Sequence, residues 1–409
     1  MELVVRNASE LVTCDGPAGG RAEDTLGRIH RGAIGVQGGR VRFLGPEAQL
    51  PPSAIGASTR VIDAHGGFVG PGLVDCHTHV VFAGDRSDEF ELRCQGKSYL
   101  EIAAAGGGIA RTVAATRSAS VDELVRLARP RLERLLRQGV TTVEIKTGYG
   151  LDVESELRML DAIAVLAREG PQSVVATFLG LHAVPKELAD RRGEWVETCL
   201  ELVDTLAKDR RCDFVDAFVE QSAFTHDEAR QLAARARTAG VPLRLHVDQL
   251  TPNGGAQLAA ELGAVTADHL EQIAPEGIAA LARAGTIAVL APTSTLFARA
   301  RPFAPGRALR DAGVPVALCT NCNPGSSNSE NVSLAMGLAC LENGLTPAEA
   351  FLGFTRVGAL ALRRPDLGRL TLGGPADLVV FAADSYRALP YHLAMNEAVH
   401  VVKAGRLVV

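Results

Sequence analysis

The sequence lacks any excess of basic residues. Its 409 residues include 42 lysines and arginines against 47 aspartates and glutamates, which gives a formal net charge of -5 at pH 7. Such a balance provides no basic surface for nucleic acid, and it is not strongly acidic either. We therefore expect no nucleic-acid partner.

Long hydrophobic runs are also missing. No apolar stretch approaches the ~20 residues that a membrane-spanning helix needs, and the first residues, MELVVR, lack a signal-peptide pattern. The eight cysteines are scattered, mostly within apolar segments, as reduced core cysteines are. Cys319 and Cys322 form a C-x-x-C pair, but no second pair accompanies it to complete a zinc site. We expect a soluble cytoplasmic protein without membrane contacts.

The middle of the chain alternates apolar runs with amphipathic segments such as 121–138, 155–169 and 227–239. The runs with strand character are 73–77, 141–146, 174–181, 214–220, 243–247, 264–269, 286–291 and 314–319. Eight strands separated by helices predict an α/β fold of the (β/α)8, TIM-like barrel type. An open doubly wound sheet is the alternative, but no G-x-G-x-x-G motif follows the first of these strands.

Both ends of the chain have a different character. They read as short strands with glycine turns, and neither end is long enough to bury a good core alone. We expect the two ends to pair into one small β-sandwich domain. The predicted organisation is therefore a β-sandwich made from residues 1–67 and 366–409, flanking a barrel over residues 68–365.

His77-Thr78-His79 follows the apolar run 68–76. Side chains alternate along a strand, so both imidazoles would point to the same side. Two neutral imidazoles side by side make half of a transition-metal site. The alternative interpretation is a surface strand end that carries two solvated histidines.

Further polar residues occur at the other predicted strand ends. In a barrel these ends form one mouth, and the residues there are His77, His79, Lys146, Tyr149, His182, Glu220, His246, His269, Thr293 and Asn321. His77, His79 and His246 would hold one metal ion with an open position for water. Because such a metal activates water and polarises a carbonyl, this pattern indicates hydrolysis of an amide-like bond. His182 and His269 fit supporting or substrate-orienting roles, although either alone could be a core histidine.

These residues resemble those of the amidohydrolase superfamily, and within it the imidazolonepropionases of histidine degradation. The resemblance extends over essentially the whole chain. The segments that carry it are Gly84-Asp85-Arg86, Gly106-Gly107-Gly108-Ile109, Lys146-Thr147-Gly148-Tyr149-Gly150, Gly180-Leu181-His182-Ala183, Ala267-Asp268-His269-Leu270-Glu271 and Asn323-Pro324-Gly325-Ser326-Ser327.

The resemblance implies a small-molecule substrate, 4-imidazolone-5-propanoate, whose ring amide a metal-bound water hydrolyses to N-formimidoyl-L-glutamate. Arg86 matches the position that binds the propionate, which suits a planar guanidinium; the alternative is a surface ion pair with Asp85 or Asp88. The other residues that match substrate contacts are Tyr149, His182, Gln249, Asn323, Gly325 and Ser326. The glycines at 106–108 would let the backbone approach the ligand.

The family also implies the metal content. Superfamily members with two metals place a carbamylated lysine on strand 4, where this chain has Glu220, and Lys146 is on strand 2. We therefore expect one divalent or trivalent metal per chain, zinc or iron. Barrels of this kind are commonly homodimers, and the surface pattern here favours neither a monomer nor a dimer.

Two positions depart from the family pattern. The superfamily places a metal-contacting, proton-accepting aspartate at the end of strand 8, where this chain has Asn321, and a glutamate three residues after His246, where it has Gln249. An amide can contact a metal but cannot accept a proton at ordinary pH. We expect weaker metal binding and slower turnover than with acids. Asp248 should point away from the site, and His269 is the candidate replacement base.

Three functions are compatible with this pattern. The first is metal-dependent hydrolysis of a cyclic amide, as in the imidazolonepropionases. The second is another amidohydrolase reaction, such as deamination, although Arg86 and Tyr149 suit a small carboxylated ring better than a nucleobase. The third is a catalytically silent protein that binds the same metabolite, which Asn321 and Gln249 favour. Ligand binding without product formation would distinguish the third from the first.

Overall fold

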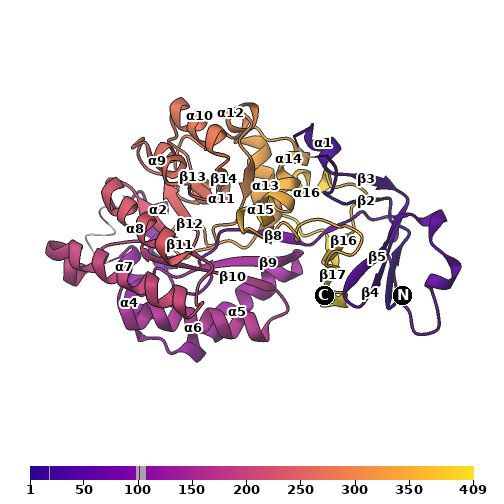
Figure 1. Cartoon of the computed structure of the whole chain (residues 1–409), viewed down its shortest axis with the longest axis horizontal. Coiled ribbons are helices and arrows are strands. Elements are labelled where there is room, and N and C mark those ends of the chain that lie inside the picture. The colour runs from indigo at the N-terminus through magenta and orange to yellow at the C-terminus, as the bar shows by residue number, and fades with distance from the viewer. Residues whose placement is uncertain (18, 98–100, 102–106) are drawn as a thin grey trace.

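The computed structural model describes residues 1–17, 19–97, 101 and 107–409. Within them, one large parallel sheet surrounded by helices lies beside two smaller sheets (Figure 1). Figure 1 also shows that both termini lie at the end of the molecule that holds the smaller sheets.

The large sheet has eight strands in sequential order, counted over the described residues. They are β8 (Leu73–Asp75), β9 (Val140–Lys146), β10 (Ser173–Leu181), β11 (Phe214–Val219), β12 (Leu243–Val247), β13 (Thr266–His269), β14 (Ile287–Leu290) and β15 (Val316–Leu318). Every neighbouring pair is parallel. The first and last strands meet through the segments that follow them, since His79 N donates to Cys322 O (2.9 Å). This nearly closed sheet confirms the predicted barrel, and the doubly wound alternative is wrong.

Helices cover the outside of the barrel. Their bounds are α2 (Ser87–Cys94), α4 (Ile109–Ser118), α5 (Val121–Arg137), α6 (Val153–Glu169), α7 (Arg192–Lys208), α8 (His226–Ala239), α9 (Gly255–Leu262), α10 (Pro275–Ala284), α11 (Pro292–Phe297), α12 (Gly306–Asp311), α13 (Val332–Leu341), α14 (Pro347–Gly353) and α15 (Arg356–Ala361). The predicted helices correspond to α5, α6 and α8. Each begins where a polar side chain, from Ser120, Asp152 or Thr225, accepts a hydrogen bond from a backbone N–H of the first turn.

The barrel strands are buried on both faces. Their outer side chains pack against the helices in one large hydrophobic core, as expected for a parallel sheet covered by helices. In β9 all seven residues are buried, including Glu144 and Lys146. The inside of the barrel therefore holds charged side chains, which the apolar character of the strands did not predict.

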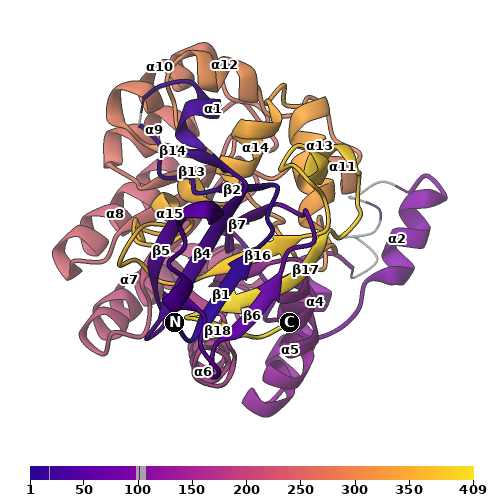
Figure 2. The same ribbon diagram turned by 90° about the vertical axis from the view of Figure 1, so that its right-hand side faces the viewer.

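Two further sheets combine the two ends of the chain. One has the strands β5 (Arg40–Pro46), β4 (Gly32–Gln37), β1 (Leu3–Arg6) and β6 (Arg60–Asp63), and the other β18 (Arg406–Leu407), β17 (Ala398–Lys403), β16 (Leu378–Phe381), β7 (Val69–Pro71), β2 (Glu10–Val12) and β3 (Arg28–His30). The short helices α1 (Ala22–Thr25) and α16 (Ala388–Tyr391) lie in the same end segments. Figure 2 shows the two sheets crossing in front of the barrel.

The two smaller sheets share a hydrophobic core of their own, which includes Val5, Ile34, Val69, Leu378 and Val402. Strands from the first and the last part of the chain contribute to it, as the sequence predicted. We therefore propose that residues 1–67 and 366–409 form one β domain beside a barrel over 68–365. The strand β7 joins the two, because it pairs with β16 just before the chain enters the barrel.

In the part of the chain that the structure describes, no helix has both the length and the apolar character to cross a membrane.

Candidate active site

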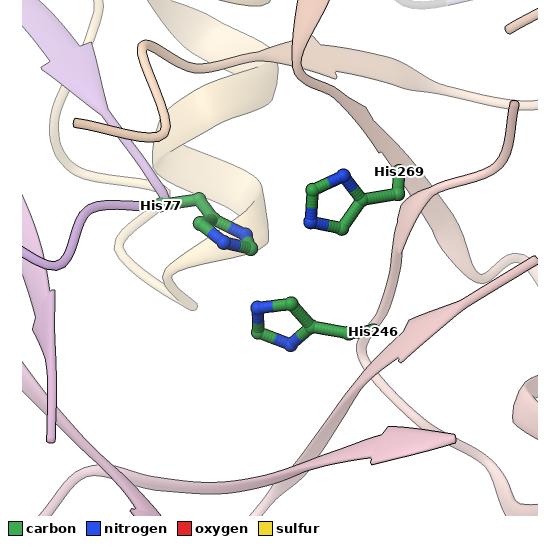
Figure 3. A group of neighbouring side chains, drawn as sticks. All are labelled: His77, His246 and His269. Atoms are coloured by element: carbon green, nitrogen blue, oxygen red, sulfur yellow. The ribbon is translucent and has the colours of Figure 1, made fainter. Parts of the chain in front are cut away.

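Five histidines converge at the mouth of the barrel. His77 and His79 follow β8, His182 follows β10, His246 lies in β12 and His269 ends β13. The ring centroids of His77 and His246 are 4.5 Å apart, and that of His269 is 5.3 Å from His246. Figure 3 shows the rings of His77, His246 and His269 pointing toward one another from three different segments. The structure thus brings together the histidines that the sequence placed at separate strand ends.

One subset of these rings is arranged to hold a metal ion. His77, His246 and His269 are buried, and each offers a ring nitrogen within 4.8 Å of the other two. His79 lies beside this group, with its ring centroid 5.3 Å from His77 and 5.7 Å from His246. The ligand set His77, His79 and His246 therefore stays a prediction, and His269 is a further candidate ligand.

Buried polar atoms without partners mark the same place. His77 Nε2, His246 Nε2 and Asn321 Oδ1 are buried and have no hydrogen-bond partner among the described residues. Such atoms are rare in folded proteins, and their grouping at this place fits a bound ligand. Burial, with Lys146 and the neighbouring imidazoles, lowers the pKa of His77, His79 and His246 well below its usual value. The rings are therefore neutral, the form that binds a divalent metal, and these donors fit one.

Asn321 lies just after β15, where the expected aspartate would be. Its backbone N–H donates to His77 O (3.2 Å), and its φ of 49° lies in the left-handed region that asparagine tolerates. Gln249 also lines the pocket. Asp248 turns away, because its carboxylate accepts from the N–H groups of Gly255 (2.9 Å) and Ala256 (2.8 Å). As predicted, Asp248 cannot replace the missing acid.

A pocket opens over these histidines. Its lining consists of His79, Tyr149, His182, Phe218, His246, Gln249, His269, Asn321, Asn323 and Ser326. Almost every residue in this set was predicted from the sequence, and Phe218 is the addition. Phe218 was missed because it lies within an apolar strand, where an aromatic residue usually belongs to the core.

His182 has a defined tautomer. Its Nδ1 lies 2.8 Å from Gly148 O, and a carbonyl oxygen can only accept, so Nδ1 carries the proton. The other nitrogen, Nε2, is then an acceptor on a ring that lines the pocket. Glu156 binds the same loop, because its carboxylate accepts hydrogen bonds from the N–H groups of Gly150 (2.8 Å) and Leu151 (2.9 Å). Sequence reasoning did not identify Glu156.

Arg86 is engaged by a neighbour other than the two expected ones. Its Nε donates to Glu89 Oε2 (2.8 Å), whereas Asp85 and Asp88 have other partners. Its guanidinium lies next to Gly325, where a Cβ would be 2.6 Å from Nη1. The alternative of a surface pair with Asp85 or Asp88 is therefore wrong, and Arg86 reaches the loop after β15.

The loop at 323–327 is organised by its own first residue. Asn323 Oδ1 accepts from the N–H groups of Gly325 and Ser326, both at 2.8 Å, and its Nδ2 donates to Asn321 O (2.7 Å). The side chain that was predicted to contact the substrate thus also shapes the loop that presents Ser326.

The glycines at 106–108 are described only in part. Gly108 N donates to Glu89 Oε1 (3.0 Å), so the carboxylate that binds Arg86 also binds this segment. Gly106 lies outside the described residues.

A cluster of buried charges lies inside the barrel beneath the histidines. Lys146 Nζ is 2.7 Å from Glu144 and 2.9 Å from Asp216. Burial opposes the charge of Lys146, but these carboxylates and Asp268 raise its pKa above the usual value. Lys146 thus pairs with buried carboxylates, and the absence of carbamylation stays a prediction. Glu220 is occupied elsewhere, accepting from the backbone of 249–251.

The cluster could have been found from the sequence. Glu144 and Lys146 are two residues apart in β9, as Arg244 and His246 are in β12, so each pair shares one face of its strand. The register pairs His246 with Asp268 on the next strand. Charged residues at this spacing in buried strands were the missed signal.

His269 has an unusual backbone and a nearby carboxylate. Its φ of 83° and the φ of 71° at Leu270 are both in the left-handed region, a conformation that often marks a functional site. Its Nδ1 is 3.8 Å from Glu271 Oε1, and Glu271 accepts from Thr295 Oγ1 (2.8 Å). His269 thus has an acidic neighbour, as a general base often does.

The side chains of the C-x-x-C pair do not line the pocket. Cys319 and Cys322 are both free and buried, and burial raises the pKa of each thiol. A redox-active thiol needs the opposite shift.

Comparison with known proteins identifies the family of the chain. The sequence model of the Amidohydrolase family matches residues 95–409. A protein named imidazolonepropionase from Myxococcus xanthus (strain DK1622) is 57% identical over 410 residues, covering 100% of this chain and 97% of that protein. Another of the same name, from Bacillus cereus (strain B4264), is 41% identical over 412 residues, covering 100% of this chain and 96% of that protein. The chain belongs to the imidazolonepropionase family of amidohydrolases.

Solved structures show the same fold at lower identity. An atrazine chlorohydrolase from Arthrobacter aurescens TC1, complexed with zinc, has a TM-score of 0.70 at 19% identity and covers 100% of this chain and 95% of its own. An adenosine deaminase from Xanthomonas campestris with bound zinc has a TM-score of 0.71 at 20% identity, with 99% and 92% covered. These likenesses show the fold alone, and the family assignment comes from the sequence relatives.

Proposed function

We propose that this amidohydrolase hydrolyses the ring amide of 4-imidazolone-5-propanoate to N-formimidoyl-L-glutamate, in histidine degradation. The observation that carries the proposal is the 57% identity to an imidazolonepropionase over the whole chain. The five histidines at the barrel mouth and the guanidinium of Arg86 supply the chemistry that this substrate requires. These features favour the reaction over deamination of a nucleobase.

One metal ion per chain, zinc or iron, is part of the proposal. His77, His79, His246 and Asn321 would hold it, with His269 as the further candidate. When bound, a metal there lowers the pKa of water and polarises a carbonyl. Elemental analysis of the purified protein distinguishes the two metals. A homodimer and a cytoplasmic location also stay predictions, and sedimentation equilibrium checks the first.

The residues of the chain account for the remaining steps. Arg86 binds the propionate. His182 accepts a hydrogen bond from a ring N–H of the substrate through Nε2. His269 takes the proton of the attacking water as oxygen bonds to the ring carbonyl carbon, and it returns that proton to the ring nitrogen as the C–N bond breaks. Asn321 cannot take that proton, since its side chain is an amide.

The direct test is turnover of 4-imidazolone-5-propanoate by the purified, metal-loaded protein. Formation of N-formimidoyl-L-glutamate supports the proposal. If the ligand binds but no product forms, the protein is a silent binder of the metabolite, and the proposed function is wrong.

Replacement of Arg86 by glutamine should weaken substrate binding. A charge-assisted hydrogen bond contributes about 1.5–3 kcal/mol, so we expect KM to rise about 10–100-fold while kcat changes little. Steady-state kinetics on Arg86→Gln measure both. Arg111→Gln is the matched control, because Arg111 is an exposed arginine that pairs with Asp88. An unchanged KM in Arg86→Gln would remove Arg86 from the substrate site.

A further inference from the structure

Two of the histidines at the barrel mouth are hydrogen-bonded to buried carboxylates. His77 Nδ1 lies 2.6 Å from Asp268 Oδ2, and His246 Nδ1 lies 3.1 Å from Asp216 Oδ1. All four side chains are almost completely inaccessible to solvent. No water competes for these contacts, so they define how each ring is held.

The chemistry of the contacts fixes the proton on each ring. A carboxylate can only accept a hydrogen bond, so the Nδ1 that faces it must carry the hydrogen. A neutral imidazole has one N–H, which leaves a lone pair on Nε2. His77 Nε2 and His246 Nε2 are the buried atoms that have no other partner among the described residues. Both lone pairs are thus available at the barrel mouth.

Each of the two carboxylates also has a buried cation beside it. Arg244 Nη2 is 3.0 Å from Asp268 and 2.9 Å from Cys76 O. Lys146 Nζ is 2.9 Å from Asp216. Because an unpaired buried charge is very costly, each cation favours the charged form of the carboxylate that it touches. These contacts hold the two aspartates in place beside the histidine rings.

We propose that Asp268 and Asp216 are positioning residues, which keep His77 and His246 protonated at Nδ1 and so direct the Nε2 lone pairs toward the metal. The inference rests on the proposed metal site, since the lone pairs need a cation to bind. The proposal gives a role to the buried charges inside the barrel, which take no part in the proposed reaction steps. It also explains why charged residues occur in buried strands at this register.

Glu144 provides a matched control within the same cluster. It contacts Lys146 (2.7 Å) and accepts from Thr78 N (3.2 Å) and Thr177 Oγ1. None of the contacts described for it involves a histidine. Glu144→Gln therefore removes one buried negative charge, as Asp268→Asn does, but leaves the histidine contacts in place.

The first measurement uses the unaltered, metal-free protein labelled with ¹⁵N at histidine. Long-range ¹H–¹⁵N correlation spectra distinguish a protonated Nδ1 from a protonated Nε2. We expect His77 and His246 to carry the hydrogen on Nδ1. A hydrogen on Nε2 of either ring would overturn the proposal for that ring. This outcome does not depend on turnover, so it is independent of the proposed function.

The second measurement is Zn²⁺ affinity by competition with a chelator. Removing a partner of a metal-binding histidine typically lowers affinity about 10–100-fold, and we expect this loss for Asp268→Asn and for Asp216→Asn. Glu144→Gln should change affinity far less. An equal loss in all three would mean that the cluster acts through its charge alone, and would overturn the proposal. Circular dichroism checks that each variant is folded. If a variant is not folded, the tautomer measurement on the labelled parent protein still tests the proposal.

Discussion

Replacing Asn321 by aspartate should increase turnover. The amide lies at the end of β15 with a buried, unpartnered Oδ1, and a carboxylate there would accept the proton that the amide cannot. General-base catalysis typically contributes ~10²–10⁴-fold in all, and this is the upper limit of the rise in kcat that we expect, because His269 already serves as a base in the proposed mechanism. The added negative charge should also tighten metal binding. Initial rates on the metal-loaded protein, with chelator competition, measure both effects.

The neighbouring amide is the control for this change. Asn323→Asp places a new carboxylate two residues away. In the present structure Asn323 Nδ2 donates to Asn321 O, and an aspartate would lose this hydrogen bond. We therefore expect a loss of order in the loop instead of a gain in rate. If Asn321→Asp is folded, binds metal and is no faster than the parent, Asn321 is not the missing proton acceptor. His269 would then be the sufficient base, and His269→Asn should remove the remaining activity. Adding Gln249→Glu tests the second amide.

Removing the His246 imidazole should have the opposite effect. His246→Ala deletes a buried ring nitrogen that lies within 4.8 Å of ring nitrogens of His77 and His269. A metal stabilises the transition state by several kcal/mol, and each 1.36 kcal/mol is a factor of ten in rate. We therefore expect metal retention to be lost and kcat to fall by about 10³-fold or more. Elemental analysis and kinetics on the same sample measure this.

His65→Ala is the matched control for that variant. The His65 side chain is 86% exposed and belongs to the β segments at the N-terminal end, away from the barrel mouth. Its loss should leave metal content and turnover unchanged. Full activity in His246→Ala would show that the ligand set does not include this residue.

The barrel was predictable because its strands are continuous apolar runs of the right length. In a parallel sheet covered on both faces, a strand such as β12 needs no polar side. Each strand can therefore be recognised in the sequence as a continuous apolar run, without an alternation of polar and apolar residues. The carboxyl ends then meet at one edge by geometry alone. The convergence of His246 and His269 follows directly from this rule.

The exact position of His79 did not follow, because the strand ends earlier than the pattern suggested. β8 stops at Asp75, and beyond it the chain is held by single contacts, such as Asn321 N to His77 O. Side-chain alternation applies only within a ladder, so it does not place His79 on the face of His77. The ring instead stacks on His182, with centroids 5.4 Å apart.

The protein partner of Arg86 was missed for a similar reason. The alternative to propionate binding named only Asp85 and Asp88, but α2 begins at Ser87 and places Glu89 in its first turn. Asp85 accepts from Ser87 N and Asp88 pairs with Arg111. Only the folded turn decides which of three nearby acids faces the guanidinium.

The sheet that joins the two ends of the chain has a consequence for synthesis on the ribosome. β7 emerges early, but its partner β16 begins at Leu378 and is followed by β17. Until β16 has left the exit tunnel, one edge of β7 stays open and part of its apolar core is uncovered, a state prone to association with other chains. The barrel strands are all made before β16, so the pairing of β16 with β7 is the event that closes this sheet.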